Sequence, residues 1–107
     1  MSGFENRRIG AEGKFAHDEE RRFLARARRD RLLGRWVGET FLGKSADDVE
    51  RYAEDVVAAN FDRPGDDDMV GFVLKSVEGT GADLSEHRLR HKMEELMREA
   101  ERQLSEE

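Results

Sequence analysis

Apolar residues recur at helical spacing in four stretches of this chain, and this pattern constrains the fold more than any other feature. The four stretches are residues 14–42, 46–60, 67–78 and 85–104. Within each, apolar positions follow one another every three or four residues, as they do on one face of an α-helix. Gly43, the Pro64–Gly65 pair and residues 79–81 interrupt the pattern between the stretches. Short connections between four amphipathic helices predict an all-α fold, a four-helix bundle.

The amino-acid composition supports helices and excludes several classes of protein. Charged residues make up 41% of the 107 positions, and the β-branched and aromatic residues that favour strands are few. The chain has no cysteine, which excludes disulfides, a thiolate nucleophile and a cysteine-ligated metal. No apolar run approaches the roughly 20 residues that cross a bilayer, and the first ten residues lack the apolar stretch of a signal peptide. We therefore expect a soluble, cytoplasmic protein that does not insert into a membrane.

Charge is unevenly distributed along the chain. The net charge is +4 from the first residue to Trp36 and −10 from Val37 to the end, which gives −6 overall. Two readings of the basic part remain open: a segment directed at an acidic or anionic surface, or a solvated helix face. Residues 1–14 contain three glycines and few apolar side chains. We therefore expect a flexible N-terminal arm over 1–14 and a four-helix bundle domain over 15–107.

The first helical stretch has two apolar faces instead of one. The N-terminal face comprises Phe23, Leu24 and Ala27, and the C-terminal face comprises Leu33, Trp36, Val37 and Phe41. At 3.6 residues per turn the two faces point roughly 115° apart, so one straight helix cannot bury both against the same partner. The C-terminal face, with Trp36, is expected in the core. The N-terminal face is expected to project from the bundle or to dock on a separate surface.

Two polar clusters have metal-ligand chemistry but are better explained without a metal. His87 and His91 are four residues apart, a spacing that lets two imidazoles bind one ion, but they lie opposite the apolar face of their helix. The acidic run 66–68, with Asp62, lacks the alternating ligands of a calcium loop. We expect the acidic run to cap the third helix, as Ser45 and Ser85 cap the second and fourth. The sequence therefore predicts no metal site.

The sequence shows no set of catalytic residues. There is no phosphate-binding glycine loop and no nucleophile–base spacing, so we predict that the protein is not an enzyme. Seven arginines between residues 21 and 35 raise the question of nucleic acid, but acidic residues are interleaved with them. The net charge of −6 also argues against a phosphate-backbone binder. A nucleotide phosphate, which needs only two or three basic groups, is less strongly excluded.

The segment from Gly13 to Glu39, GKFAHDEERRFLARARRDRLLGRWVGE, resembles the zeta subunit of alphaproteobacterial F-type ATP synthases. The resemblance extends over the whole chain. Its closest parts are residues 14–20, 27–29, 32–34 and Trp36, followed by 52–53, 56–59, 65–66, 85–87 and 92–93. That family is a small inhibitor of the ATPase activity of the synthase.

The resemblance implies a four-helix bundle whose N-terminal segment inserts between catalytic subunits and blocks ATP hydrolysis. The implied partner is the catalytic head with its alpha, beta and gamma subunits, at the cytoplasmic face of the inner membrane. The resemblance also implies which residues bind this partner. They are Phe4, Arg7, Arg8, Ile9, Lys14, Phe15, His17, Asp18, Glu19 and Glu20. Phe15 has a second reading as a hydrophobic staple on the first helical turn.

One departure from the family pattern bears on the strength of inhibition. Where the family commonly has Ala-Phe-Glu before the Lys-Phe pair, this chain has Gly10-Ala11-Glu12-Gly13. An aromatic anchor is missing, and each glycine disfavours helix by up to about 1 kcal/mol relative to alanine. The alternative function is an adenine-nucleotide-binding helical module with weak or lost inhibition. We expect no tightly bound cofactor, with weak binding of ATP or ADP left open.

Overall fold

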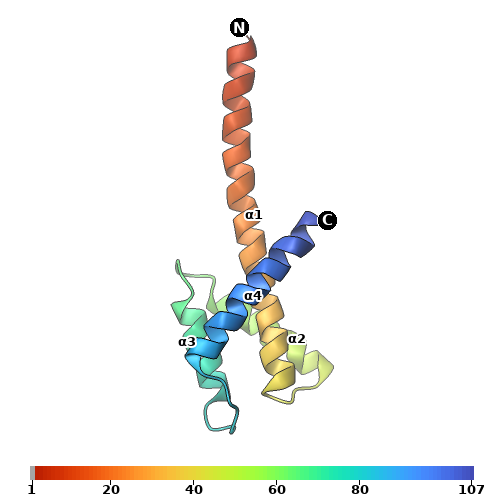
Figure 1. The fold of residues 1–107 in the computed structure, drawn as a ribbon, viewed down its shortest axis with the longest axis vertical. Helices are drawn as coiled ribbons and strands as arrows, with labels where there is room; N and C mark the ends of the chain where they lie inside the picture. The colour runs from red at the N-terminus through yellow and green to blue at the C-terminus, as the bar shows by residue number, and fades with distance from the viewer. Residues whose placement is uncertain (1) are drawn as a thin grey trace.

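The protein folds into four α-helices, as the periodicity predicts (Figure 1). The computed structural model describes residues 2–107 and gives side chains from Asp18 onward. The helices are α1 (Ser2–Thr40), α2 (Ala46–Ala59), α3 (Asp67–Val77) and α4 (Glu86–Ser105). No strand occurs among residues 2–107, so the all-α four-helix fold is confirmed.

α1 is the central element of the fold. It packs against α2 and against α4, while α3 contacts α2 and α4 (Figure 1). Gly34 sets the distance between α1 and α2, because a Cβ atom at this position would lie 2.5 Å from the Cα atom of Ala53. α1 ends before Gly43, whose φ of +59° is a left-handed conformation that glycine adopts readily.

The core forms from one apolar stripe of each helix together with Leu84 from the last connection. Its buried members are Leu33, Val37, Tyr52, Val56, Met69, Val70, Val73, Val77, Leu84, Leu89 and Met93. Leu33 and Val37 are the two members that come from the C-terminal apolar face predicted for the first helical stretch. The C-terminal face of α1 is therefore the face that enters the core.

Trp36 differs from the prediction, because it lies at the rim of the core and is only half-buried. Its ring packs edge-on against Phe41, with centroids 5.1 Å apart. The Lys92 ammonium lies 5.1 Å from the Trp36 ring centroid, so a cation on α4 covers part of the outer face of the ring. Sequence spacing places Trp36 on the correct stripe, but it does not show whether a residue lies at the edge or at the centre of that stripe.

The predicted caps Ser45, Asp66 and Ser85 all occupy the N-cap positions of their helices, but of the three only Ser85 bonds its helix through the side chain. Ser85 accepts a hydrogen bond of 3.1 Å from the backbone N–H of Arg88, as a cap should. Ser45 precedes α2 without a side-chain cap bond, although its carbonyl accepts the first helical hydrogen bond. Asp66 also makes no cap bond, since its carboxylate points toward α1. The carboxylate of Asp66 therefore bonds Arg29 of α1 instead of the backbone N–H groups at the start of α3.

Candidate functional site

The two faces predicted for α1 have opposite exposure. Leu33 and Val37 are fully buried. Phe23 is 57% exposed and Leu24 45% exposed, and no helix packs over either. Ala25, one position further on, is the first buried residue among those with described side chains. α1 therefore joins the bundle from about residue 25 onward.

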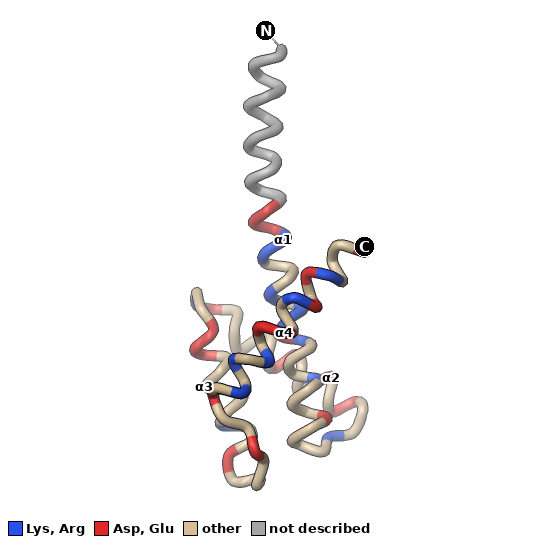
Figure 2. Tube along the Cα trace, in the orientation of Figure 1, with Lys and Arg blue, Asp and Glu red and all other residues tan. Residues whose placement is uncertain are grey.

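The seven arginines between residues 21 and 35 are bonded to acidic or polar groups of the same chain. Figure 2 shows the basic stretch of α1 next to acidic residues of the other helices. The pairs are Arg21 with Ser105, Arg22 with Glu19, Arg26 with Asn60, Arg28 with Glu107, Arg29 with Asp66, Arg31 with Glu54 and Arg35 with Glu50. The structure supports neither of the two readings of this basic stretch. The arginines are not a free cationic surface, and they are not only solvated. All of these arginines except Arg22, whose partner Glu19 is on α1 itself, connect α1 to other parts of the fold.

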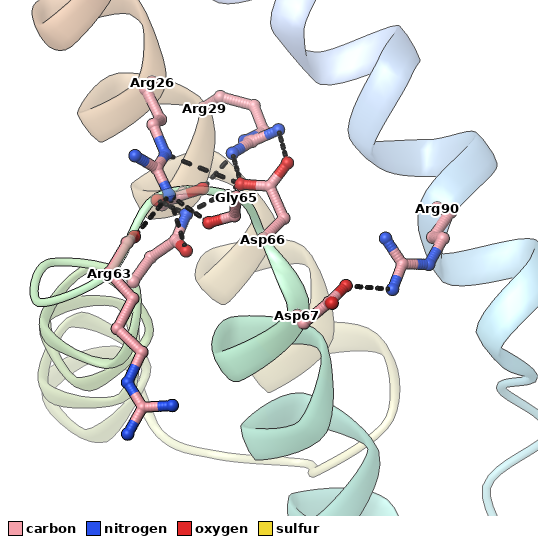
Figure 3. Close-up of polar contacts among 9 residues, drawn as sticks. Arg26, Arg29, Arg63, Gly65, Asp66, Asp67 and Arg90 are labelled. Atoms are coloured by element: carbon pink, nitrogen blue, oxygen red, sulfur yellow. Dashed lines mark hydrogen bonds and ion pairs between the residues drawn. The ribbon is translucent and has the colours of Figure 1, made fainter.

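A buried polar network joins α1 to the end of α2 and the start of α3 (Figure 3). Asn60 is its centre: the side-chain amide donates to Asp30 at 2.8 Å and to Asp66 at 3.0 Å. The amide oxygen of Asn60 accepts a bond of 2.9 Å from Arg26. Arg29 donates to both carboxylates, Asp30 and Asp66, at 2.7 Å each. Arg29, Asp30 and Asn60 are each at least 95% buried, so each needs these partners to offset desolvation.

The two carboxylates of the network differ in proton affinity. Burial raises the pKa of Asp30, and the charge of Arg29 and the bond from Asn60 offset this only in part. Burial also acts to raise the pKa of Asp66, but hydrogen bonds from Arg29 and Asn60 outweigh it and leave the pKa below its ordinary value. Asp66 is the more exposed of the two carboxylates, and it also faces Arg26 at 3.5 Å. Asp66 therefore stays ionised at lower pH than Asp30.

Sequence reasoning placed the members of this network on helix faces but did not join them. Arg26 and Arg29 were counted as surface cations, and Asp66 as a helix cap. The available signal was Asn60, a polar residue at an apolar-stripe position of α2, which must find partners when buried. Its partners on α1, Asp30 and Arg26, lie 30 and 34 positions away in sequence.

A shallow groove lies beside the network, on the exposed face of α1. Its volume is about 240 Å³, and it is lined by Phe23, Arg26, Ala27, Asp30, Val57, Asn60 and Phe61. The rings of Phe23 and Phe61 meet edge to face, with centroids 6.3 Å apart. Phe61 is 69% exposed, and it follows the last residue of the α2 stripe. Phe61 was missed in the sequence, because it belongs to a connection without periodicity.

The residues implied as partner-binding lie mostly outside the described side chains. These are Phe4, Arg7, Arg8, Ile9, Lys14, Phe15 and His17. Asp18, Glu19 and Glu20 are exposed on α1, and Glu19 pairs with Arg22 at 3.2 Å. The predicted flexibility of residues 1–14 also falls outside that part of the chain.

The polar clusters singled out in the sequence have ordinary surroundings. His87 and His91 are exposed on α4. Asp67 pairs with Arg90 at 3.0 Å, and Asp68 lies 3.6 Å from Arg63. Across residues 18–107, no group of three or more His, Cys, Asp or Glu side chains is arranged to hold a metal ion. No helix in the described part of the chain is long and apolar enough to cross a membrane.

Comparison with known proteins agrees with the sequence resemblance. A search of curated proteins gives no significant match. A family model described as ATPase inhibitor subunit zeta matches residues 1–103, which is nearly the whole chain and includes both the N-terminal segment and the bundle. The chain belongs to the family of ATPase inhibitor zeta subunits.

Proposed function

We propose that this protein inhibits ATP hydrolysis by F-type ATP synthase by inserting its N-terminal segment between catalytic subunits. The observation that carries the proposal is the family match over residues 1–103. The exposure of α1 supports it, because every residue from Asp18 to Leu24 is exposed. The contacts of this part of α1 with the bundle lie at the surface, at Arg21 and Phe23, so a partner can reach it without unfolding the core. The protein then acts as a regulator and performs no catalysis of its own.

The proposed inhibitory segment combines apolar and basic side chains. Phe4, Ile9 and Phe15 serve as apolar anchors in a cleft of the head, as aromatic and aliphatic groups commonly do at interfaces. Arg7, Arg8 and Lys14 meet acidic or polar groups at its edge. The side chains of His17, Asp18, Glu19 and Glu20 support the segment where it leaves the bundle. The arm, residues 1–14, and the domain, 15–107, thus have separate tasks.

The proposed partner is the catalytic head of the synthase, formed by its alpha, beta and gamma subunits. Binding there places the protein at the cytoplasmic face of the inner membrane without contact of its own with lipid. Ordering a short segment costs conformational entropy, which contacts in a preformed cleft must offset. Stalling the head in this way blocks the hydrolytic direction of rotation.

ATP hydrolysis by the cognate head, measured with increasing amounts of this protein, tests the proposal. The full chain should lower the rate to a saturating minimum. Replacing both Arg7 and Arg8 by alanine should weaken inhibition at least tenfold, because two charged contacts are lost. Arg51→Ala is the matched control, since Arg51 is an exposed arginine on α2 that lies 3.6 Å from Asp48 of the same helix. An unchanged hydrolysis rate at saturating full-length protein would contradict the proposal.

Binding of an adenine nucleotide is a second candidate, favoured by the two phenylalanine rings that line the groove beside Asn60. Aromatic rings stack readily on bases. Arg26 and Arg29 are already bonded to Asn60 and Asp66, which leaves less charge for phosphates. Isothermal titration of the free protein with ATP and ADP tests this candidate, and the absence of heat at millimolar nucleotide would reject it.

A further inference from the structure

We propose that Phe23, Leu24 and Phe61 form a second docking surface, here called the aromatic patch, for an apolar surface of the same catalytic head. This inference rests on the proposed inhibitory function and extends it. The N-terminal segment supplies inhibition, and the aromatic patch supplies additional affinity beside it. The patch is the N-terminal apolar face of α1, extended by a ring from the α2–α3 connection.

The patch collects the large apolar side chains that the bundle leaves in water. Among residues 18–107, the exposed large hydrophobic side chains are these three, at 57%, 45% and 69% exposure. Phe23 comes from α1 and Phe61 from the α2–α3 connection, 38 positions later in the chain, yet their rings are in edge-to-face contact. Single exposed apolar side chains are common on protein surfaces. A cluster of exposed rings from separate elements is instead typical of an interaction surface.

The polar floor of the groove indicates that its occupant is apolar. Asn60 uses its amide on both Asp30 and Asp66, and its oxygen accepts from Arg26. One nitrogen of Arg26 also reaches the carbonyl oxygens of Arg63 and Gly65. Because these groups bond to one another, a polar ligand would have to compete with existing bonds. An apolar side chain packed into the groove against the two rings gains burial without breaking any of these bonds.

The network also holds the patch in shape. Asn60 directly precedes Phe61, and its side chain is fixed at both ends by α1 and by Asp66. Phe23 lies one turn before Arg26 on α1. A patch on rigid supports loses little side-chain entropy when it binds. The groove is therefore preorganised in the free protein.

The size of the patch argues against a second copy of this chain as its occupant. Two phenylalanines and a leucine, each partly exposed, offer a few hundred Å² at most. A stable dimer needs about 800 Å² on each partner. The patch is therefore too small to hold a partner alone and serves as an extension of a larger contact. That contact is adjacent, because Phe23 follows Glu20, the end of the proposed inhibitory segment, by less than one helical turn.

Affinity for the catalytic head, measured by isothermal titration separately from hydrolysis, tests the aromatic patch. Phe61→Ser in the full chain should weaken binding about tenfold and should leave the thermal midpoint of the free protein unchanged, because Phe61 is mostly exposed. Asp62→Ser, the next position in the same connection, is the matched control and should bind as the unmodified chain does. Phe23→Ser should weaken binding to a similar extent. The binding free energy lost in the double variant, compared with the sum of the two single losses, gives the coupling between the two rings.

The outcomes separate the patch from the inhibitory function. Full affinity in Phe61→Ser, with inhibition intact, would overturn the patch and leave the proposed function standing. Weaker binding in Phe61→Ser supports the patch even where the unmodified chain binds without inhibiting, a result that would reject the inhibitory function alone. Dimers of the unmodified chain that Phe61→Ser dissociates, seen by sedimentation, would overturn the patch in favour of a second copy. Heat from ATP that Phe61→Ser abolishes would overturn it in favour of a nucleotide.

Discussion

Two stretches of α1, around Phe23 and around Leu33, have similar apolar patterns but differ in burial. Leu33 and Val37 are fully buried, because α2 and α4 pack over that face. Phe23 and Leu24, three turns earlier, stay about half exposed. Amphipathic spacing thus shows that a helix has an apolar face, whereas neighbouring elements decide whether the face is buried. An apolar face that its own fold leaves uncovered is available to a partner.

The largest expected contrast between these stretches is in stability. Leu33→Ala should lower the free energy of unfolding by about 2–5 kcal/mol, since it leaves a cavity in the centre of the core. Phe23→Ala should lower it by at most about 1 kcal/mol, because Phe23 is mostly exposed and loses only its edge-to-face contact with Phe61. Urea unfolding followed by circular dichroism measures both. Equal losses in the two variants would mean that the N-terminal stretch also belongs to the core.

Removing one charge from the buried network should have the next largest effect. Asp66→Asn should cost about 1.5–3 kcal/mol at pH 7, because Arg29 loses its charged partner on α3 while keeping Asp30. Asp67→Asn is the matched control: Asp67 is almost fully exposed and pairs only with Arg90, so its loss should cost under about 1 kcal/mol. The free energy of unfolding of both variants, from urea titrations, gives the comparison.

The cost of Asp66→Asn should depend on pH. The pKa of Asp66 is lowered in the fold from its ordinary value of 3.8, so its contribution to stability is complete above that value. The contribution disappears as the pH falls through the lowered pKa, where the carboxylate of the unmodified chain takes up a proton. The stability gap between the two proteins should therefore narrow below about pH 3.8. A gap that is constant from pH 7 to pH 2.5 would show that charge on Asp66 contributes nothing.

The close approach of α1 and α2 predicts a smaller, position-specific effect. Gly34→Ala should cost about 1–3 kcal/mol, since its Cβ would lie 2.5 Å from a backbone atom of Ala53 and the helices must separate. Gly38→Ala, one turn later, places its Cβ 3.5 Å from Val49, an ordinary contact. That variant should be neutral, or up to about 1 kcal/mol more stable through helix propensity. Thermal midpoints of the two variants test the contrast, and their reversal would mean that α1 and α2 pack differently.

Local patterns predicted the helices and most of the core, because spacing within one helix determines which side chains share a face. Contacts between distant segments could not be predicted in this way. Arg29 and Asp66 lie 37 positions apart, and nothing in the sequence indicates that Asp66 bonds Arg29 instead of capping α3. Trp36 lies at the rim for the same reason, since its exposure depends on how far α4 covers it.

The candidate site was predictable in part. The separate apolar face at Phe23 and Leu24 follows from angles along one helix, and the structure agrees that it lies outside the core. Phe61 did not follow, because a connection carries no periodic signal and its contact with Phe23 arises from the fold. The roles of the first 17 residues come from family resemblance alone and stay predictions.

The central claim is that the bundle provides the stability of the fold, while the N-terminal segment inhibits ATP hydrolysis. It is tested most directly by deleting Ser2 to Lys14 and measuring the thermal midpoint and the inhibition of ATP hydrolysis on the same preparation. The account predicts an unchanged midpoint, since the described core begins only after Leu24, together with complete loss of inhibition. Ala11→Phe, which restores an aromatic anchor, should instead strengthen inhibition about tenfold if it adds about 1.4 kcal/mol of contact. Inhibition by the truncated chain equal to that of the full chain would contradict the account and move the inhibitory surface to the bundle.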